Sequence, residues 1–160
     1  MTARRTTGQR AWYEDVPLPQ LMRYARDVYR VAVREALDGA GCDDLPRNGG
    51  VVVAGLDRRD REPAFSPQAD AVAPLGLSKQ MASQLIDTLV LREYLERRTD
   101  PGDRRRMEVR LTPRGRRAAR AIQDATEDVE AELAARITPD ELRGLRAGLA
   151  AFRALHEETA

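Results

Sequence analysis

Apolar residues recur at helical spacing over three long stretches of this chain. From Leu18 onward, and again after Thr112-Pro113 and Thr138-Pro139, they fall three or four positions apart, as on one face of an amphipathic helix. Each Thr-Pro pair combines an N-cap residue with proline at the first helical position. The pattern therefore predicts a first helix from Leu18 that ends at Gly39, a second of about 20 residues or more, and a last helix.

The middle of the chain carries shorter patterns. Residues 46–58 include VVVAGL, whose spacing is ambiguous between strand and helix; we expect a short buried helix, followed by a charged loop over residues 57–63. Ser66-Pro67 predicts the start of another short helix that ends around residues 74–76. Ser78 predicts the N-cap of a further helix. The expected inner stripe of that helix is Met81, Leu85, Ile86 and Leu89.

Two short segments, from Tyr94 to Thr99 and from Met107 to Leu111, have the pattern of strands. DPGDRRR lies between them, and its Pro-Gly indicates a turn, so the two segments predict a β-hairpin. The predicted class is mainly α with one small hairpin. The first helix and the last two carry a long apolar seam that so short a chain cannot cover, which predicts a dimer built from the chain ends.

Charge is distributed unevenly, although the formal net charge is only +1. Between residues 92 and 120, eleven arginines stand against five acidic residues, whereas residues 121–160 hold four arginines and nine acidic residues. Lys79 is the single lysine, and arginine suits bidentate contact with phosphate or guanine. A GC-rich coding sequence explains the arginine total but not the clustering. The clustering predicts a local surface that binds a polyanion.

The sequence argues against several function classes. No apolar run approaches the roughly 20 residues that span a bilayer, and the first residues lack the apolar region of a secretory signal. The single cysteine, Cys42, fits a reducing cytoplasm, where we expect the protein to reside. We find no nucleophile with a base, no paired catalytic carboxylates in a motif, no metal-ligand cluster and no phosphate loop. We therefore expect neither an enzyme nor a bound cofactor.

Three motifs occur in order in this part of the chain: LGLSKQ at the start of the helix after Ser78, Asp103-Arg104-Arg105 in the predicted turn, and VRLTPRG from Val109 to Gly115. Through these motifs, residues 77–115 resemble the MarR (multiple antibiotic resistance regulator) family of winged-helix transcription factors. The resemblance covers about residues 18–158 and implies a winged helix-turn-helix dimerised through its N- and C-terminal helices. The chain then divides into a flexible tail (1–17), an N-terminal dimerisation helix (18–45), a DNA-binding lobe (46–111) and C-terminal dimerisation helices (112–160).

The resemblance also implies which side chains contact duplex DNA. One helix face would lie in the major groove, and the wing tip would reach the minor groove through Arg105, with Asp103 pairing with a nearby arginine to fix the loop. The implied DNA-binding residues are Ser78, Lys79, Gln80, Ser83, Gln84, Arg104, Arg105 and Arg106. The implied function is that of a homodimeric repressor that binds a pseudo-palindromic operator and is relieved by a small aromatic effector, an aromatic or phenolic acid that binds between the lobes.

Several positions depart from the family pattern. Gln84 and Thr88 stand where the family often has arginine, and Glu93 stands where a glycine usually ends the recognition helix. If that position needs a positive φ, Glu93 carries a strain of roughly 1 kcal/mol. The lost arginines keep an alternative open, namely a dimeric interaction module whose winged helix no longer binds specific DNA.

Three further sets of residues each have two interpretations. Cys42 could sense peroxide, but Asp43 and Asp44 oppose thiolate formation, so we favour an inert thiol. His156, the single histidine, is expected at the surface or in the dimer interface. Four aromatic residues could line an effector pocket, although packing in the core or the interface is the simpler expectation. They are Trp12, Tyr13, Tyr24 and Tyr29.

Overall fold

The computed structural model describes residues 11–61, 75–99 and 107–159 of the 160-residue chain. The elements within these residues are α1 (Leu18–Gly39), α2 (Gly49–Arg61), α4 (Lys79–Leu91), β1 (Leu95–Thr99), β2 (Met107–Leu111), α5 (Pro113–Ala134) and α6 (Pro139–Thr159). The described part of the chain is therefore mainly α with one small hairpin, which confirms the predicted class. The helix predicted after Ser66-Pro67 and the wing residues 103–106 lie outside the described residues.

Three of the predicted helix starts, at Ser78, Thr112 and Thr138, are confirmed by their caps. The Ser78 hydroxyl accepts the N–H of Met81 at 3.3 Å, and the Thr112 hydroxyl accepts the N–H of Gly115 at 3.0 Å. At the start of α6, the Thr138 hydroxyl accepts from the N–H of Glu141 at 3.2 Å, while the Glu141 carboxylate accepts from the N–H of Thr138 at 2.8 Å. This reciprocal pair is a capping box, so α6 begins where its local sequence dictates.

Three local predictions were wrong in detail. The segment expected to open a charged loop, residues 57–61, continues α2, because charged residues do not end a helix as proline does. Strand β1 begins at Leu95 rather than at Tyr94, which still belongs to the turn after α4. Met81 is 54% exposed instead of lying on the inner stripe, because it belongs to the first turn of α4, whereas the buried Leu89 lies about two turns further along the helix.

One hydrophobic core joins α2, α4, the hairpin and the first half of α5. Its largest fully buried side chains are Tyr94, Leu89, Leu95, Leu111, Val52 and Val53, and Ala118 and Ala119 supply the surface of α5. The prediction that VVVAGL forms a short buried helix is confirmed, since Val52, Val53 and Leu56 of α2 all enter this core. We call α2, α4, β1 and β2 the lobe.

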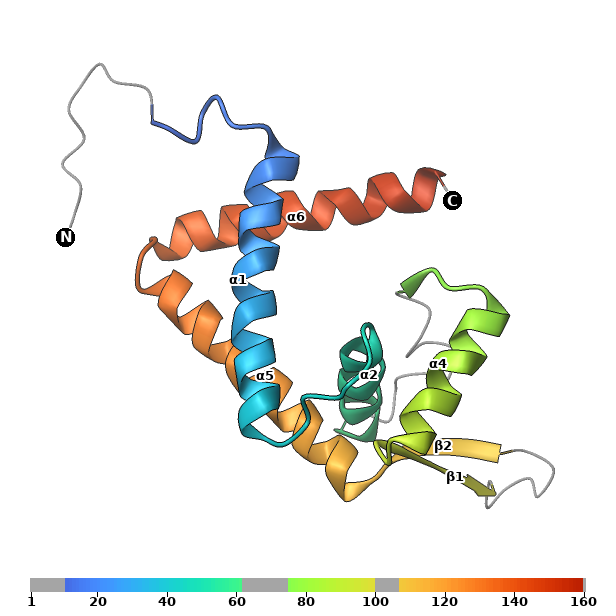
Figure 1. Cartoon of the computed structure of the whole chain (residues 1–160). Coiled ribbons are helices and arrows are strands. Elements are labelled where there is room, and N and C mark those ends of the chain that lie inside the picture. The colour runs from blue at the N-terminus through green and yellow to red at the C-terminus, as the bar shows by residue number, and fades with distance from the viewer. Residues whose placement is uncertain (1–10, 62–74, 100–106, 160) are drawn as a thin grey trace.

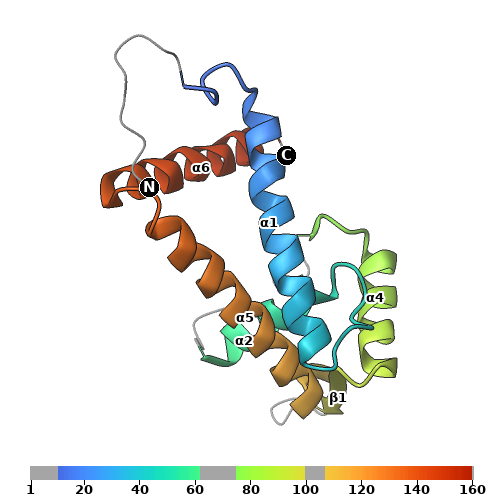
Figure 2. The same cartoon turned by 60° about the vertical axis from the view of Figure 1, so that its left-hand side comes forward.

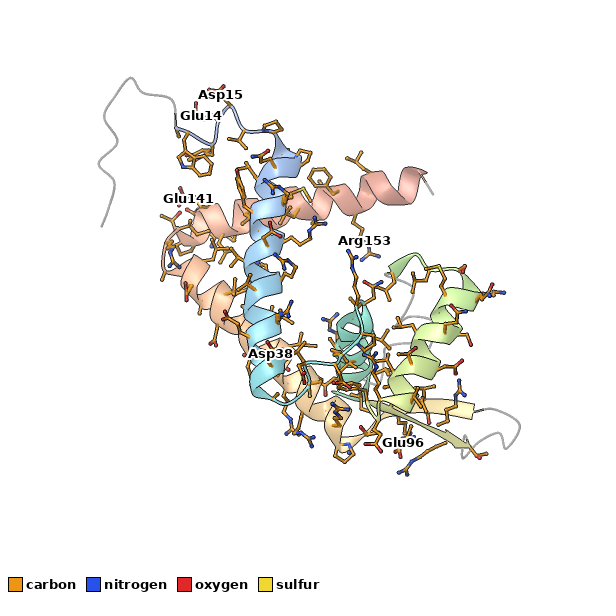
Figure 3. All side chains as sticks on the ribbon, viewed as in Figure 1. Glu14, Asp15, Asp38, Glu96, Glu141 and Arg153 are labelled. Carbon is orange, nitrogen blue, oxygen red and sulfur yellow. The ribbon has the colours of Figure 1, made fainter. Side chains whose placement is uncertain are left out.

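The remaining helices form an open frame beside the lobe. Figures 1 and 2 show α1, α5 and α6 as the three sides of a triangle, which we call the stem, and α5 runs from the hairpin to the far end of the molecule. Glu96 on β1 and Glu141 at the start of α6 mark these two opposite ends (Figure 3). No side chain described on α6 is buried, so this helix leaves its apolar face open in the protomer.

Among the described helices, none combines the length and the apolar character needed to span a bilayer.

Candidate nucleic-acid interface

Helix α4 presents a polar face to solvent over its first two turns. Leu89 is buried, and Leu85 and Ile86 pack against the core, so the opposite side of the helix faces outward. The exposed residues at the start of α4 are Ser78, Lys79, Gln80, Met81, Ser83 and Gln84. The structure thus brings the five predicted major-groove residues onto one accessible surface and adds Met81 to it. A helix of this kind can enter the major groove with its N-terminal residues toward the bases.

The C-terminal end of α4 is closed by a left-handed residue. Glu93 has φ of 59°, the N–H of Tyr94 donates to the carbonyl of Leu89 at 2.9 Å, and the N–H of Glu93 donates to that of Val90 at 3.0 Å. The positive φ expected at the usual glycine position is therefore present, with glutamate adopting it. Such a conformation costs a non-glycine residue roughly 1 kcal/mol.

Beyond its second turn, α4 is tied to itself and to the hairpin. The Thr88 hydroxyl donates to the carbonyl of Gln84 at 2.8 Å, which engages the hydroxyl proton within the helix. The Asp87 carboxylate forms an ion pair with the guanidinium of Arg97 on β1. This ion pair links α4 to β1 of the hairpin.

Other hairpin arginines lie beside acidic residues two positions away on the same strand. Arg98 pairs with Glu96 at 2.8 Å, and Arg110 pairs with Glu108 at 2.9 Å. Both arginine side chains are about half exposed or more, so these pairs are screened by solvent and contribute little to stability. These pairs leave the charge of the described strands largely balanced. The predicted wing contacts, Arg104, Arg105 and Arg106, lie outside the described residues.

Arg114 at the start of α5 joins three segments that lie far apart in the sequence. Its guanidinium donates to the Asp44 carboxylate at 2.8 Å, to the carbonyl of Arg92 at 2.8 Å and to that of Gly41 at 3.3 Å. The same group lies 4.5 Å from the centre of the Tyr94 ring. Arg114 therefore fastens the α1–α2 loop and the turn after α4 to the first turn of the stem helix.

Tyr94 completes this cluster with its hydroxyl, which donates to the Asp44 carboxylate at 2.5 Å. That hydrogen bond, with the nearby guanidinium groups of Arg114 and Arg92, lowers the pKa of Asp44 against the opposing effect of burial. Burial of the phenol, and its bond to the carboxylate, raise the pKa of Tyr94. The cluster thus holds a carboxylate and a neutral phenol together at neutral pH. Sequence reasoning missed it because its members share no spacing pattern.

Cys42 lies in the core beside this cluster. Its side chain is fully buried and its thiol lies 3.6 Å from the carbonyl oxygen of Ala40, to which it donates. Burial restricts access of an oxidant, which supports the interpretation of an inert thiol. Within the described ranges, no group of three acidic, cysteine or histidine side chains is placed to hold a metal ion.

The aromatic residues of the N-terminal region are mostly exposed. Trp12 and Tyr13 are 71% and 54% exposed and contact each other edge to face, and Tyr24 accepts a hydrogen bond from Gln20. Tyr29 lines an apolar groove of about 750 Å³ between α1 and α5. A second pocket, of about 460 Å³, lies between α2 of the lobe and α5 of the stem. The side chain of His156 is not among those described.

Comparison with known proteins identifies this architecture. The family model described as the MarR family matches residues 55–106. None of the curated proteins matches the sequence. Solved structures match over nearly the whole chain at identities below 25%, and this likeness shows the fold. Proteins of the MarR family are transcription regulators and not enzymes.

Three of these structures were solved with a bound molecule. A MepR mutant from S. aureus bound to an oligodeoxyribonucleotide has 18% identity and a TM-score of 0.53, covering 88% of this chain and 98% of that chain. S. aureus MepR bound to ethidium bromide has 19% identity and a TM-score of 0.58, with coverages of 86% and 95%. CouR from Rhodococcus jostii bound to p-coumaroyl-CoA has 22% identity and a TM-score of 0.63, with coverages of 90% and 95%.

Proposed function

We propose that this chain, whose residues 55–106 match the MarR family model, is a member of that family and acts as a dimeric, sequence-specific DNA-binding repressor of transcription. The observation that carries the proposal is the exposed polar face of α4 beside a hairpin, between whose strands the sequence holds Arg104, Arg105 and Arg106. A MepR mutant of the same fold is bound to an oligodeoxyribonucleotide. In the docking geometry of helix-turn-helix proteins, α4 would enter the major groove while the wing contacts the neighbouring backbone and minor groove.

Fluorescence anisotropy with DNA from the chain's own promoter region tests DNA binding. Affinity should fall steeply as salt rises, because each phosphate contact releases condensed counterions. We expect Arg105→Ala to weaken binding at least tenfold and to reduce the salt dependence, without changing the urea midpoint of unfolding. Arg143→Ala is the matched control, because Arg143 carries the same charge at the start of α6, away from the lobe. Equal losses in both variants would remove the wing from the mechanism.

The open apolar face of α6 supports the dimer. Leu145, Leu149, Phe152 and Leu155 are 44%, 45%, 43% and 57% exposed, and α1 offers Leu18, Met22, Val28 and Val31 with similar exposure. Completing the burial of one such side chain contributes about 1 kcal/mol to the free energy of dimerisation. In a symmetric dimer the same side chain of the second protomer contributes as much again. A second copy of the chain, contributed through α1 and α6, is the occupant that we propose for this surface.

The oligomeric state is measured by analytical ultracentrifugation. We expect a dimer for the unmodified protein and a shift toward monomer for Leu149→Glu, because a charge in a closing apolar interface must be desolvated. Ala147→Glu is the matched control, since position 147 lies on the opposite side of α6. A monomeric unmodified protein at micromolar concentration would overturn the dimer.

A small aromatic effector would act between the lobe and the stem. The pocket between α2 and α5 has apolar walls from Ala54 and Ile122, and its charged groups are Asp57, Arg58, Glu127 and Glu130. Acidic groups outnumber basic ones there, which favours a cationic or neutral aromatic over the aromatic acid implied by the resemblance. Repression requires a spacing of the two lobes that fits the operator. A ligand would relieve repression only if it bound the dimer more tightly at a spacing that does not fit the operator than at the spacing that does.

Thermal unfolding with paired probes tests the effector. Benzyltrimethylammonium should raise the melting temperature more than benzoate does, and it should weaken operator binding. Equal or absent shifts with both probes would count against this pocket.

The alternative, an interaction module without specific DNA binding, is favoured by two observations. Thr88 is engaged within α4, and the described hairpin arginines pair with neighbouring carboxylates. Such a protein would bind promoter DNA and random DNA equally weakly at physiological salt, so the anisotropy experiment separates the two functions.

A further inference from the structure

Helix α4 exposes a small patch whose chemistry suits one kind of base pair. Resting on the proposed function, we infer that Gln80, Met81 and Gln84 select A·T pairs in the major groove, with the two amides on adenine and the thioether against the thymine methyl group. The inference goes beyond DNA binding because it names the bases that the operator must present to this helix.

The three side chains form one continuous surface. Gln80 and Gln84 are four residues apart and Met81 and Gln84 are three apart, so on a helix each pair is adjacent. Met81 is 54% exposed although its type favours burial, and it is not among the described side chains that pack against the core. All three lie in the first two turns after the Ser78 cap, which is the part of a recognition helix that meets base edges.

The chemistry of the patch distinguishes the bases. A glutamine amide forms two hydrogen bonds with adenine: its NH₂ group donates to N7, and its carbonyl oxygen accepts from the N6 amino group. Guanine instead presents two acceptors, N7 and O6, which a bidentate cation contacts. Helix α4 contains no arginine, and its one cation, Lys79, is at its first residue, where we assign it to the phosphate backbone. An apolar side chain finds its match in the C5-methyl group of thymine.

The next turn of α4 limits how many bases this patch can read. The Asp87 carboxylate is held by Arg97 of β1, and the Thr88 hydroxyl donates back to Gln84, so neither continues the patch. Four residues of helix span about 6 Å, or roughly two base-pair steps. The operator should therefore hold two or three consecutive A·T pairs at the centre of each major-groove contact.

The test starts by selecting binding sites for the full-length protein from a randomised duplex library. The selected half-sites should share a short A·T core, and replacing that core by G·C should weaken binding about 10- to 100-fold. In the best site, 7-deazaadenine should weaken binding because it lacks N7, and uracil in place of thymine should weaken it about threefold because it lacks the methyl group.

Variants assign the effects to side chains. Gln84→Ala and Gln80→Ala should lose the response to 7-deazaadenine, and Met81→Ala should lose the response to uracil, while all keep their urea midpoints. Leu91→Ala is the control, because Leu91 is 83% exposed at the far end of α4 and should change neither response. Selection of a G·C core, or wild-type binding that ignores both modified bases, would overturn the inference and leave the proposed function intact. Equal binding of all library sequences would overturn both.

Discussion

Gly115 is the residue at which a single added methyl group should do the most damage to the joint between lobe and stem. A Cβ atom there would lie 2.1 Å from the backbone carbonyl oxygen of Tyr94 and 3.0 Å from a methyl group of Leu111. The carbonyl of Tyr94 also accepts the N–H of Thr112 at 3.1 Å. Because backbone rather than a flexible side chain blocks the methyl group, the first turn of α5 must move away from the hairpin.

The magnitude follows from three terms for Gly115→Ala. Overpacking of a well-packed site costs typically about 1–3 kcal/mol. Weakening the bond from Thr112 to Tyr94 costs about 1 kcal/mol. Alanine is a better helix former than glycine by roughly 1 kcal/mol, which offsets part of the loss. The free energy of unfolding should therefore fall by about 2 kcal/mol.

Urea unfolding followed by circular dichroism measures this change, at one fixed protomer concentration because dimerisation adds to apparent stability. Gly144→Ala is the control, since the Cβ of an alanine at this position in α6 would meet nothing within 4 Å. This variant should be unchanged or more stable by up to roughly 1 kcal/mol. The close approach of α5 to Tyr94 would be refuted if Gly115→Ala unfolded at the wild-type midpoint with an unchanged slope.

Further predictions concern the left-handed residue and the Asp44 cluster. Glu93→Gly should stabilise the protein by about 0.5 kcal/mol, because relief of the positive φ exceeds the added entropy of the unfolded chain; a lower urea midpoint would contradict this. Tyr94→Phe should lower the free energy of unfolding by about 1 kcal/mol, because it removes the hydrogen bond to Asp44. In a protein that already carries Asp44→Ala, the same substitution should cause no further loss, which a double-mutant cycle measures. The pKa of Asp44 is lowered by folding, so its stabilising effect is complete above its ordinary pKa and is lost as the pH falls below about 4. Asp44→Asn should flatten the fall in unfolding free energy over that acidic range, and an unchanged pH profile would refute the coupling.

The recognition face of α4 could be predicted from sequence only in part. Its polar residues follow from the cap at Ser78 and the helical period, but the exposure of Met81 does not, because the period alone assigns it to the inner stripe. Whether a first-turn residue is covered depends on what the rest of the fold brings over it. The ion pair of Asp87 with Arg97 depends likewise on how the hairpin lies against the helix.

What the sequence determined by itself is local. The Thr-Pro starts of α5 and α6 and the strand segments follow from interactions between residues a few positions apart. The joint between lobe and stem was decided only by the tertiary structure, because Arg114 and Tyr94 meet Asp44 across 70 and 50 positions of chain. No periodicity encodes such contacts; they exist because the buried faces of several elements can be satisfied together in one arrangement, which then brings these polar groups within hydrogen-bonding distance.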